Sequence, residues 1–310
     1  MKMNTSRLSS VSVLHLTLSF FLLPLVGCVH MPPTRPIVTG PKASLTTDKG
    51  PVTIVFKPTL NDIDVTDYHS QSVTKAYSNN QVVKTLTDSL DFTVKTKTVE
   101  IDKGNQNATY DLKTIKKTGL ADLADFALPD LGETLELIMT NQGKVLKAGD
   151  YPPGTLFFVP PVSLPDAPVK VGDSWPMTTE WVSLKSGVPL KMKTLSTLKA
   201  IRQCGTTGKC AEIDLTGTVE LENPTNSSST VSKPDSKPKF TSSMSGSLLF
   251  SLDRGTVLYS YLKSSEGLSA KTTRIQIESC MVTRVSSPSD ENLLGKSPLG
   301  CNPSDGPPQY

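Results

Sequence analysis

Apolar and polar residues alternate with a period of two through most of the chain from Val52 to Val285, and this pattern constrains the fold most strongly. Successive side chains of a strand point to opposite faces of a sheet, so the alternation is typical of antiparallel strands buried on one face. Val, Thr, Ile and Phe are frequent in these segments, and Gly-containing turns separate them. The expected strands are residues 52–56, 90–101, 108–115, 134–140, 191–200, 211–221, 245–252, 256–261 and 273–285.

Helical periodicity is scarce. Residues 120–128 and 65–76 are the best candidates for short helices. The chain of 310 residues is 36% hydrophobic and 20% charged, which is compatible with a packed core. The sequence therefore predicts a mainly β globular protein with a few short helices.

A short repeat indicates two similar halves. Residues 134–146 can be laid over residues 246–258 at one offset, which places Gly143 on Gly255 in equivalent turns. A long hairpin pattern precedes each copy, and a Pro-rich segment joins the halves. The alternative is a chance similarity between two β-hairpins. The predicted units are residues 52–160 and 161–285.

The N-terminus has the layout of a signal peptide. Lys2 and Arg7 precede an apolar run that ends in the sequence Leu-Val-Gly-Cys at Cys28. This ending resembles the lipobox of bacterial lipoproteins, in which the cysteine receives diacylglycerol and becomes the first residue of the mature chain. The resemblance implies removal of residues 1–27 and lipidation of Cys28, so the bilayer is an expected partner. An ordinary secretory signal that contains a cysteine is the alternative.

The residues after Cys28 predict where the mature domain lies. In enterobacterial-type sorting an Asp at the next position retains a lipoprotein at the inner membrane, and this chain has Val29 there. The resemblance thus favours the outer membrane, facing the periplasm. Residues 28–51 are Pro-rich and read as a tether, since an extended chain rising about 3.1 Å per residue could reach about 60 Å from the bilayer.

The charge balance argues against nucleic acid as a partner. Removal of the first 27 residues takes away Lys2 and Arg7, so 30 Lys and Arg residues remain against 29 Asp and Glu residues. A near-neutral surface lacks the basic field that nucleic-acid binding needs. Residues 222–239 and 286–310 are polar and rich in Ser and Pro, so we expect a flexible insertion and a disordered tail.

Four cysteines follow Cys28 in a chain that we expect in an oxidising compartment. Cys204 and Cys210 lie at the two ends of a Gly-containing turn between expected strands, so we predict a disulfide across this hairpin. Cys280 and Cys301 would then pair and fix the tail. The spacing does not resemble a zinc site, because there is no Cys-x-x-Cys pair and no histidine nearby.

One segment carries a family resemblance. Residues 164–175 read Leu-Pro-Asp-Ala-Pro-Val-Lys-Val-Gly-Asp-Ser-Trp. This is similar to the Pro-x-x-Pro-Val-Lys-Val-Gly-Asp-Ser-Trp segment of an uncharacterised family of secreted bacterial β-rich proteins, in which it lies between two β units. The family has no assigned activity. The layout is also loosely similar to the incomplete β-barrels of periplasmic lipoprotein carriers and receptors, which implies a curved sheet that closes over short helices around an apolar groove.

The residue types of this segment favour a structural role. Pro168 keeps the chain extended, Gly172 and Asp173 suit a turn, and Trp175 can fill one end of a barrel. Gly172-Asp173-Ser174 also resembles nucleophile motifs of serine hydrolases. However, no histidine follows Ser174, and Trp175 replaces the glycine whose amide would help hold an oxyanion.

Other catalytic chemistry has no support in the sequence. His15 lies in the signal and His30 beside the anchor, so His69, in an apparent polar turn, is the only histidine of the expected domain. A multi-histidine metal site therefore cannot be built. The acidic pairs Asp62/Asp64 and Asp122/Asp125 read as solvated turn and helix-cap residues. No phosphate-binding glycine loop occurs, so we expect no cofactor.

These observations predict a non-enzymatic, lipid-anchored periplasmic domain that binds an apolar ligand or another envelope component. A purely structural envelope lipoprotein with protein contacts only is the alternative, and an enzyme of unknown type is a third possibility.

Overall fold

The computed structural model describes residues 50–204, 208–221, 239–285 and 301. The predicted signal peptide, Cys28, nearly all of the tether, the insertion up to residue 238 and the tail other than Cys301 lie outside the described residues. The strands are β1 (Ile63–Ser78), β2 (Gln81–Asp102), β3 (Asn107–Thr118), β4 (Thr134–Thr140), β5 (Val145–Ala148), β6 (Ser174–Val182), β7 (Pro189–Gln203), β8 (Lys209–Leu221), β9 (Lys239–Ser251), β10 (Thr256–Ala270) and β11 (Thr273–Val285). Two short 3-10 helices, η1 (Leu123–Phe126) and η2 (Leu156–Phe158), accompany them.

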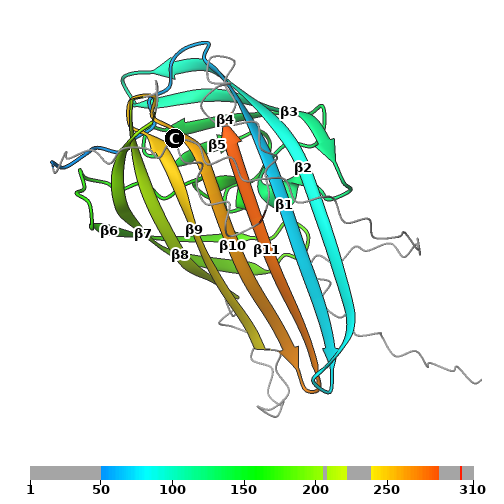
Figure 1. Ribbon diagram of the computed structural model, residues 1–310. Helices are drawn as coiled ribbons and strands as arrows, with labels where there is room; N and C mark the ends of the chain where they lie inside the picture. Colours follow the sequence, from blue (N-terminus) through cyan, green and yellow to red (C-terminus); the bar gives the residue numbers. More distant parts are fainter. Residues whose placement is uncertain (1–49, 205–207, 222–238, 286–300, 302–310) are drawn as a thin grey trace, which may run out of the picture.

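All eleven strands form one curved antiparallel sheet (Figure 1). Its order is β5-β4-β3-β2-β1-β11-β10-β9-β8-β7-β6, so each half of the chain forms a meander and the halves meet where β1 pairs with β11. The mainly β fold with a curved sheet and few helices is confirmed. Residues 52–160 contribute β1–β5 and residues 161–285 contribute β6–β11 to the same sheet.

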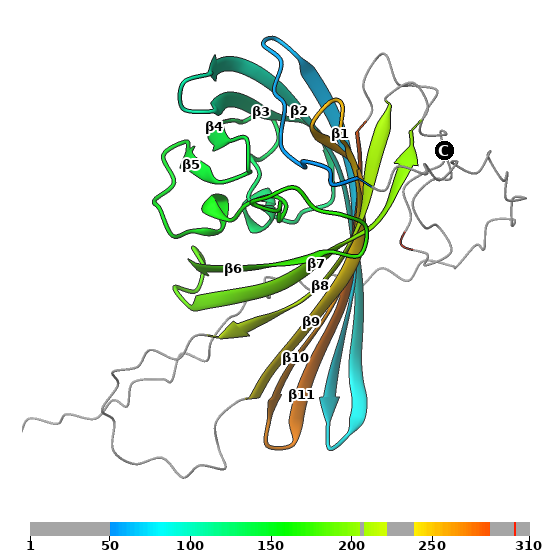
Figure 2. The same ribbon diagram turned by 90° about the vertical axis from the view of Figure 1, so that its left-hand side faces the viewer.

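The sheet stays open because its edge strands, β5 and β6, do not pair with each other. The loop after β5 instead runs beside β6, where the Val182 amide donates to the Gly154 carbonyl at 2.7 Å. Figure 2 shows that this loop, η1, η2 and the β4–β5 hairpin cover the upper half of the concave face. We call these covering segments, residues 119–165, the lid.

The helix predicted for residues 65–76 is wrong, since these residues lie in β1. Every residue of Thr66–Ser78 pairs with β11, and β1 also pairs with β2 along its length. Hydrogen bonding to a strand on each side stabilises the extended conformation more than the weak local preference of this polar segment can favour a helix. For residues 120–128, the structure forms only η1, whose first turn is capped by Asp122 accepting from the Ala124 amide at 2.9 Å.

The predicted strand at residues 52–56 is not a strand of the sheet; only Val52 forms an isolated bridge, to Val169. The segment instead joins the two turns of the sequence repeat. The Phe56 amide donates to the Asn141 carbonyl at 2.7 Å, and the Lys57 amide donates to the Gly255 carbonyl at 3.2 Å. Both turns thus contact adjacent residues of one segment; the similarity of the two β units stays a prediction.

The turn glycines permit this close approach. Gly143 and Gly255 have φ angles of 85° and 64°, in the left-handed region that favours glycine. A Cβ at Gly255 would lie 2.3 Å from the Lys57 amide nitrogen, and one at Gly143 would lie 3.1 Å from the Phe56 ring. A side chain at position 255 would therefore force the segment away from the sheet.

Both predicted disulfides are present. Cys204 pairs with Cys210 across the β7–β8 hairpin, and Cys280 pairs with Cys301, with Cα–Cα distances of 5.9 and 6.1 Å. The four cysteines share one buried cluster with Leu249, Tyr259 and Val282. The second disulfide therefore attaches Cys301 to the central strand β11.

The segment that carries the family resemblance packs as the sequence predicts. Gly172 has a φ angle of 97°, and the Asp173 carboxylate closes the turn by accepting from the Lys170 amide at 2.7 Å. Trp175 is only 8% exposed, and its indole Nε1 donates to the Ser163 carbonyl at 3.1 Å. It belongs to the largest buried cluster, with Ile54, Leu198, Phe250 and others. Pro168 comes directly before Val169, which bridges to Val52.

Candidate functional site: the lower concave face

The strand register decides which side chains share a face. Tyr68 lies opposite Phe92, and the two rings stack with centroids 4.5 Å apart beneath η1. Positions in phase with Tyr68 on the neighbouring strands therefore point to the concave face. Burial of Tyr68 in this layer raises its pKa to about 12.

Below the lid, the concave face is lined by apolar side chains. The strands β8–β11 and the β1–β2 hairpin continue past the covering segments (Figure 2). The apolar inward residues here are half-buried, and none belongs to the four buried clusters of the described core. We call this surface the lower concave face; its apolar lining comprises Leu215, Val219, Leu221, Phe240, Met244, Leu262, Leu268, Ile275, Ile277 and Met281.

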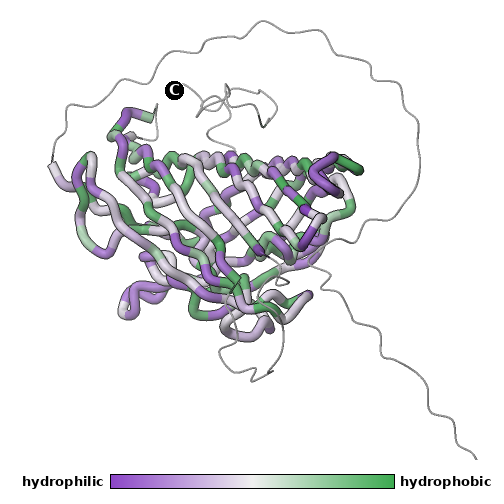
Figure 3. Tube along the Cα trace, turned by 90° about the horizontal axis from the view of Figure 1, so that it is seen from below, coloured by the Kyte–Doolittle hydropathy of each residue, from purple (hydrophilic) through white to green (hydrophobic). Residues whose placement is uncertain are grey.

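The convex side of the same strands is polar. On β9, Thr241, Ser243 and Ser245 alternate with Phe240 and Met244. Figure 3, a view from below, shows this alternation of hydrophilic and hydrophobic residues along the strands. An antiparallel sheet normally places its apolar face against a second layer. Among the described residues no such layer covers the lower half.

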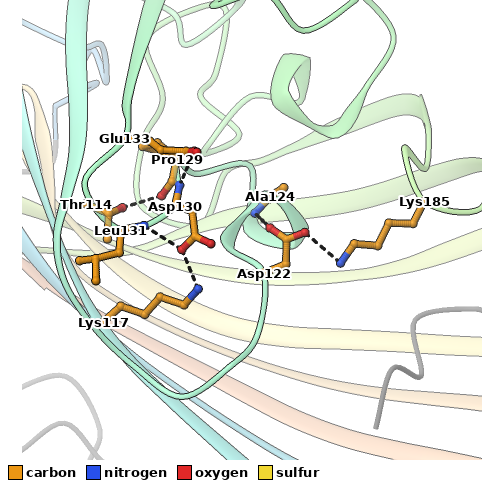
Figure 4. Close-up of polar contacts among 9 residues, drawn as sticks. All are labelled: Thr114, Lys117, Asp122, Ala124, Pro129, Asp130, Leu131, Glu133 and Lys185. Atoms are coloured by element: carbon orange, nitrogen blue, oxygen red, sulfur yellow. Dashed lines mark hydrogen bonds and ion pairs between the residues drawn. The ribbon is translucent and has the colours of Figure 1, made fainter. Parts of the chain in front are cut away.

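The lid is attached to both ends of the curved sheet. Lys185, in the β6–β7 turn, reaches across to η1, where its ammonium lies 3.3 Å from the Asp122 carboxylate (Figure 4). The same ammonium lies 2.7 Å from the Asp125 carboxylate. Burial lowers the pKa of Lys185, but the hydrogen bonds to the two carboxylates outweigh it and the pKa is raised. The pairs are partly exposed, so each contributes at most about 1 kcal/mol to folding.

A second set of contacts fixes the lid to β3. The buried Thr114 hydroxyl donates to the Pro129 carbonyl at 2.6 Å, and the Lys117 ammonium donates to the Asp130 carboxylate at 2.6 Å (Figure 4). Hydrogen bonds from Lys117 and from the Leu131 amide lower the pKa of Asp130. These contacts hold the lid over the upper half of the face and leave the lower half uncovered by it.

A single carboxylate interrupts the apolar lining of β9, β10 and β11. Glu266 of β10 lies between Ile277 of β11 and Ser242 of β9. It is mostly buried, and this burial raises its pKa. A carboxyl group in apolar surroundings resists ionisation because its charge loses hydration.

Two buried hydroxyls lie where the packed core meets the lower concave face. Thr194 and Ser196 of β7 are 6% and 0% exposed, and their hydroxyl oxygens have no hydrogen-bond partner among the described residues. Ser196 lies opposite Trp175, and Thr194 lies opposite Met177. The core therefore ends in polar groups at this level of β7.

The possible hydrolase residues do not come together. Ser174 is exposed on the convex side of the edge strand β6, where its hydroxyl lies 2.7 Å from that of Thr197. His69 lies in the central strand β1, not in a turn, with its Nδ1 2.8 Å from the Asp91 carboxylate. Six strand spacings, roughly 28 Å along the sheet, separate β1 from β6.

One of the acidic pairs differs from its prediction. Asp64 is not a solvated turn residue, because its carboxylate lies 2.7 Å from the Arg254 guanidinium in a largely buried contact. Burial raises the pKa of Asp64, although Arg254 opposes the shift. Asp62 does remain exposed at the start of β1, and Asp122 caps η1 as predicted.

The described residues show two further features. No group of three or more His, Cys, Asp or Glu side chains among them is arranged to hold a metal ion. Within the same ranges, no helix has the length and hydrophobicity needed to cross a bilayer.

The sequence alone did not locate the lower concave face. Residues 239–244 and 262–270 were missed as strands because Ser and Gly occupy many of their positions. The signal that could have found them is the spacing of Phe240, Met244, Leu262 and Leu268, which keeps an even phase within each strand. The partners across the sheet cannot be read from that spacing.

Comparisons with known proteins add little. No family model matches the chain, and no curated protein matches it. Similar solved structures include the attachment invasion locus protein Ail of Yersinia pestis, which has 6% sequence identity, covers 74% of this chain and all of that chain, and gives a TM-score of 0.15. DynF from the dynemicin biosynthesis pathway of Micromonospora chersina has 10% identity, covers 83% of this chain and 95% of that chain, and gives a TM-score of 0.18. An outer membrane channel from Pseudomonas putida F1 has 8% identity, covers 77% of this chain and 100% of that chain, and gives a TM-score of 0.21. TM-scores this low support no inference about function.

Proposed function

We propose that this protein is a lipid-anchored envelope lipoprotein that binds an apolar ligand, of the acyl-chain type, on the lower concave face. The observation that carries the proposal is the apolar lining itself: ten half-buried side chains on four adjacent strands face a side that no described layer covers. Contiguous exposed apolar surface of this kind marks ligand or partner binding in soluble domains.

The anchor is proposed from the sequence. The Leu-Val-Gly-Cys ending of the apolar N-terminal run supports lipidation of Cys28, and Val29 supports the outer membrane, with the domain facing the periplasm. No catalytic role is proposed. Ser174 lacks a nearby base among the described residues, and a nucleophilic serine needs one within hydrogen-bond reach.

The ligand proposal is tested with the mature domain carrying Cys28→Ser. We expect it to bind the neutral apolar dye N-phenyl-1-naphthylamine saturably, with enhanced fluorescence, because the lining removes the dye from water. A fatty alcohol such as dodecanol should displace the dye. A purely structural lipoprotein would show no saturable binding, and that result would overturn the proposal.

The anchor has its own test. In the native host, the unaltered protein should incorporate radiolabelled palmitate and sediment with membranes. Cys28→Ser should lose both properties, since no thiol is left to accept diacylglycerol. A single acyl chain binds a membrane only marginally, so loss of the whole anchor should release the domain. Palmitate labelling that persists in Cys28→Ser would contradict the anchor.

A further inference from the structure

Glu266 is a charged residue that lies within the apolar lining of the lower concave face. It faces the lower concave face from the C-terminal part of β10, with Ser264 and Leu268 on either side of it on this face. Its neighbours across the ladders are Ile277 and Ser242. A carboxylate enclosed by such groups loses hydration, which costs free energy unless a partner restores it.

Within the described part of the chain, no hydrogen bond or ion pair to the Glu266 carboxylate is formed. The nearby hydroxyls have other partners: Ser264 and Ser279 lie 2.6 Å apart, oxygen to oxygen, and the Ser242 oxygen accepts from the Val219 amide at 3.3 Å. No basic side chain of β9 or β11 faces it, because Arg274 and Lys239 occupy positions of the opposite phase.

The other charged residues of this face lie far from Glu266. Asp88 and Lys84 of β2 point to the same side, but β11 and β1 separate β2 from β10. Three strand spacings amount to about 14 Å. Neither residue can neutralise Glu266 directly, so the described part of the chain supplies no counter-charge to its carboxylate.

We propose that Glu266 recognises the head group of the ligand, and that the ligand is an amphiphile with an apolar chain and a protonated amine. The chain would lie on the apolar lining, and the ammonium would pair with the Glu266 carboxylate. A charge-assisted contact in this low-dielectric setting is stronger than one in water. This inference rests on the proposed function, because it requires that apolar chains bind to this face.

The test displaces N-phenyl-1-naphthylamine from the Cys28→Ser domain with three ligands of equal chain length: dodecylamine, dodecanol and dodecanoate, below micelle-forming concentrations. At about pH 8 we expect dodecylamine to bind at least about tenfold more tightly than dodecanol, and dodecanoate to bind more weakly than dodecanol. In Glu266→Gln, which keeps the shape, the amine and the alcohol should bind within about twofold of each other.

The matched control is Glu278→Gln on the convex side of β11, which should keep the preference for the amine. The preference should also be lost as the pH falls through the raised pKa of Glu266, because the protonated carboxyl carries no charge. An equal affinity for amine and alcohol in the parent, or an amine preference that persists in Glu266→Gln, would overturn the inference. If none of the three ligands displaces the dye, the proposed function itself fails.

Discussion

Trp175→Ala is expected to destabilise the domain by about 3–5 kcal/mol, the range for truncation of a large buried aromatic residue. Trp175 is 8% exposed and packs in the cluster that joins the segment at residues 52–57, the linker before β6 and strands β7–β9. The substitution also leaves the Ser163 carbonyl without its indole donor. This cost is a large share of a total stability that is typically 5–15 kcal/mol.

The measurement is the midpoint of urea unfolding, followed by circular dichroism, on domains with both disulfides oxidised. Ser174→Ala is the matched control, because Ser174 is the adjacent residue of β6, is exposed on the convex side and has its hydroxyl hydrogen-bonded to that of Thr197. It should change stability by less than about 0.5 kcal/mol. If Trp175→Ala unfolded with the parent midpoint, Trp175 would not support the core as described.

The sequence predicted the fold class, the hairpin disulfide and one turn. The alternation predicts a strand correctly where clearly apolar residues occupy one face and clearly polar residues the other, as in β4 and β11. The Cys204–Cys210 pair and the Gly172 turn could also be predicted, because each depends on residues close together in the sequence.

The binding face depends on the register between neighbouring strands, which single-strand patterns do not determine. The sequence of β1 does not reveal its strand pattern, because its inward residues Ser70, Ser72 and Thr74 are small and polar. Its pairing with β11, some 200 residues away, brings the two halves into one sheet. Glu266 and Ile277 face each other through the register of the β10–β11 hairpin, which the spacing within each strand does not determine, so the site could not be found from single-strand patterns.

Met244→Lys is expected to weaken the binding of an apolar ligand at least about tenfold. Met244 lies near the centre of the lower concave face, opposite Ser264 of β10 and Gly217 of β8. Methionine and lysine have unbranched chains of similar length, so the substitution adds a charge with little change of shape. The new ammonium is the diagonal neighbour of Glu266 across the β9–β10 ladder, within reach of its carboxylate. A ligand on this surface would have to desolvate the ammonium or displace its ion pair with Glu266, and either costs more than the 1.4 kcal/mol that a tenfold loss represents.

The central claim, that the lower concave face is the binding surface, is tested most directly by comparing Met244→Lys with Ser243→Lys. These adjacent residues of β9 point to opposite faces, and Ser243 is exposed on the convex side. The dissociation constant for N-phenyl-1-naphthylamine is measured by fluorescence titration for the Cys28→Ser domain and both variants, with circular dichroism confirming the fold of each. The account predicts that Met244→Lys raises this constant at least about tenfold and that Ser243→Lys leaves it within about twofold of the parent. Equal affinities for the two folded variants would contradict it.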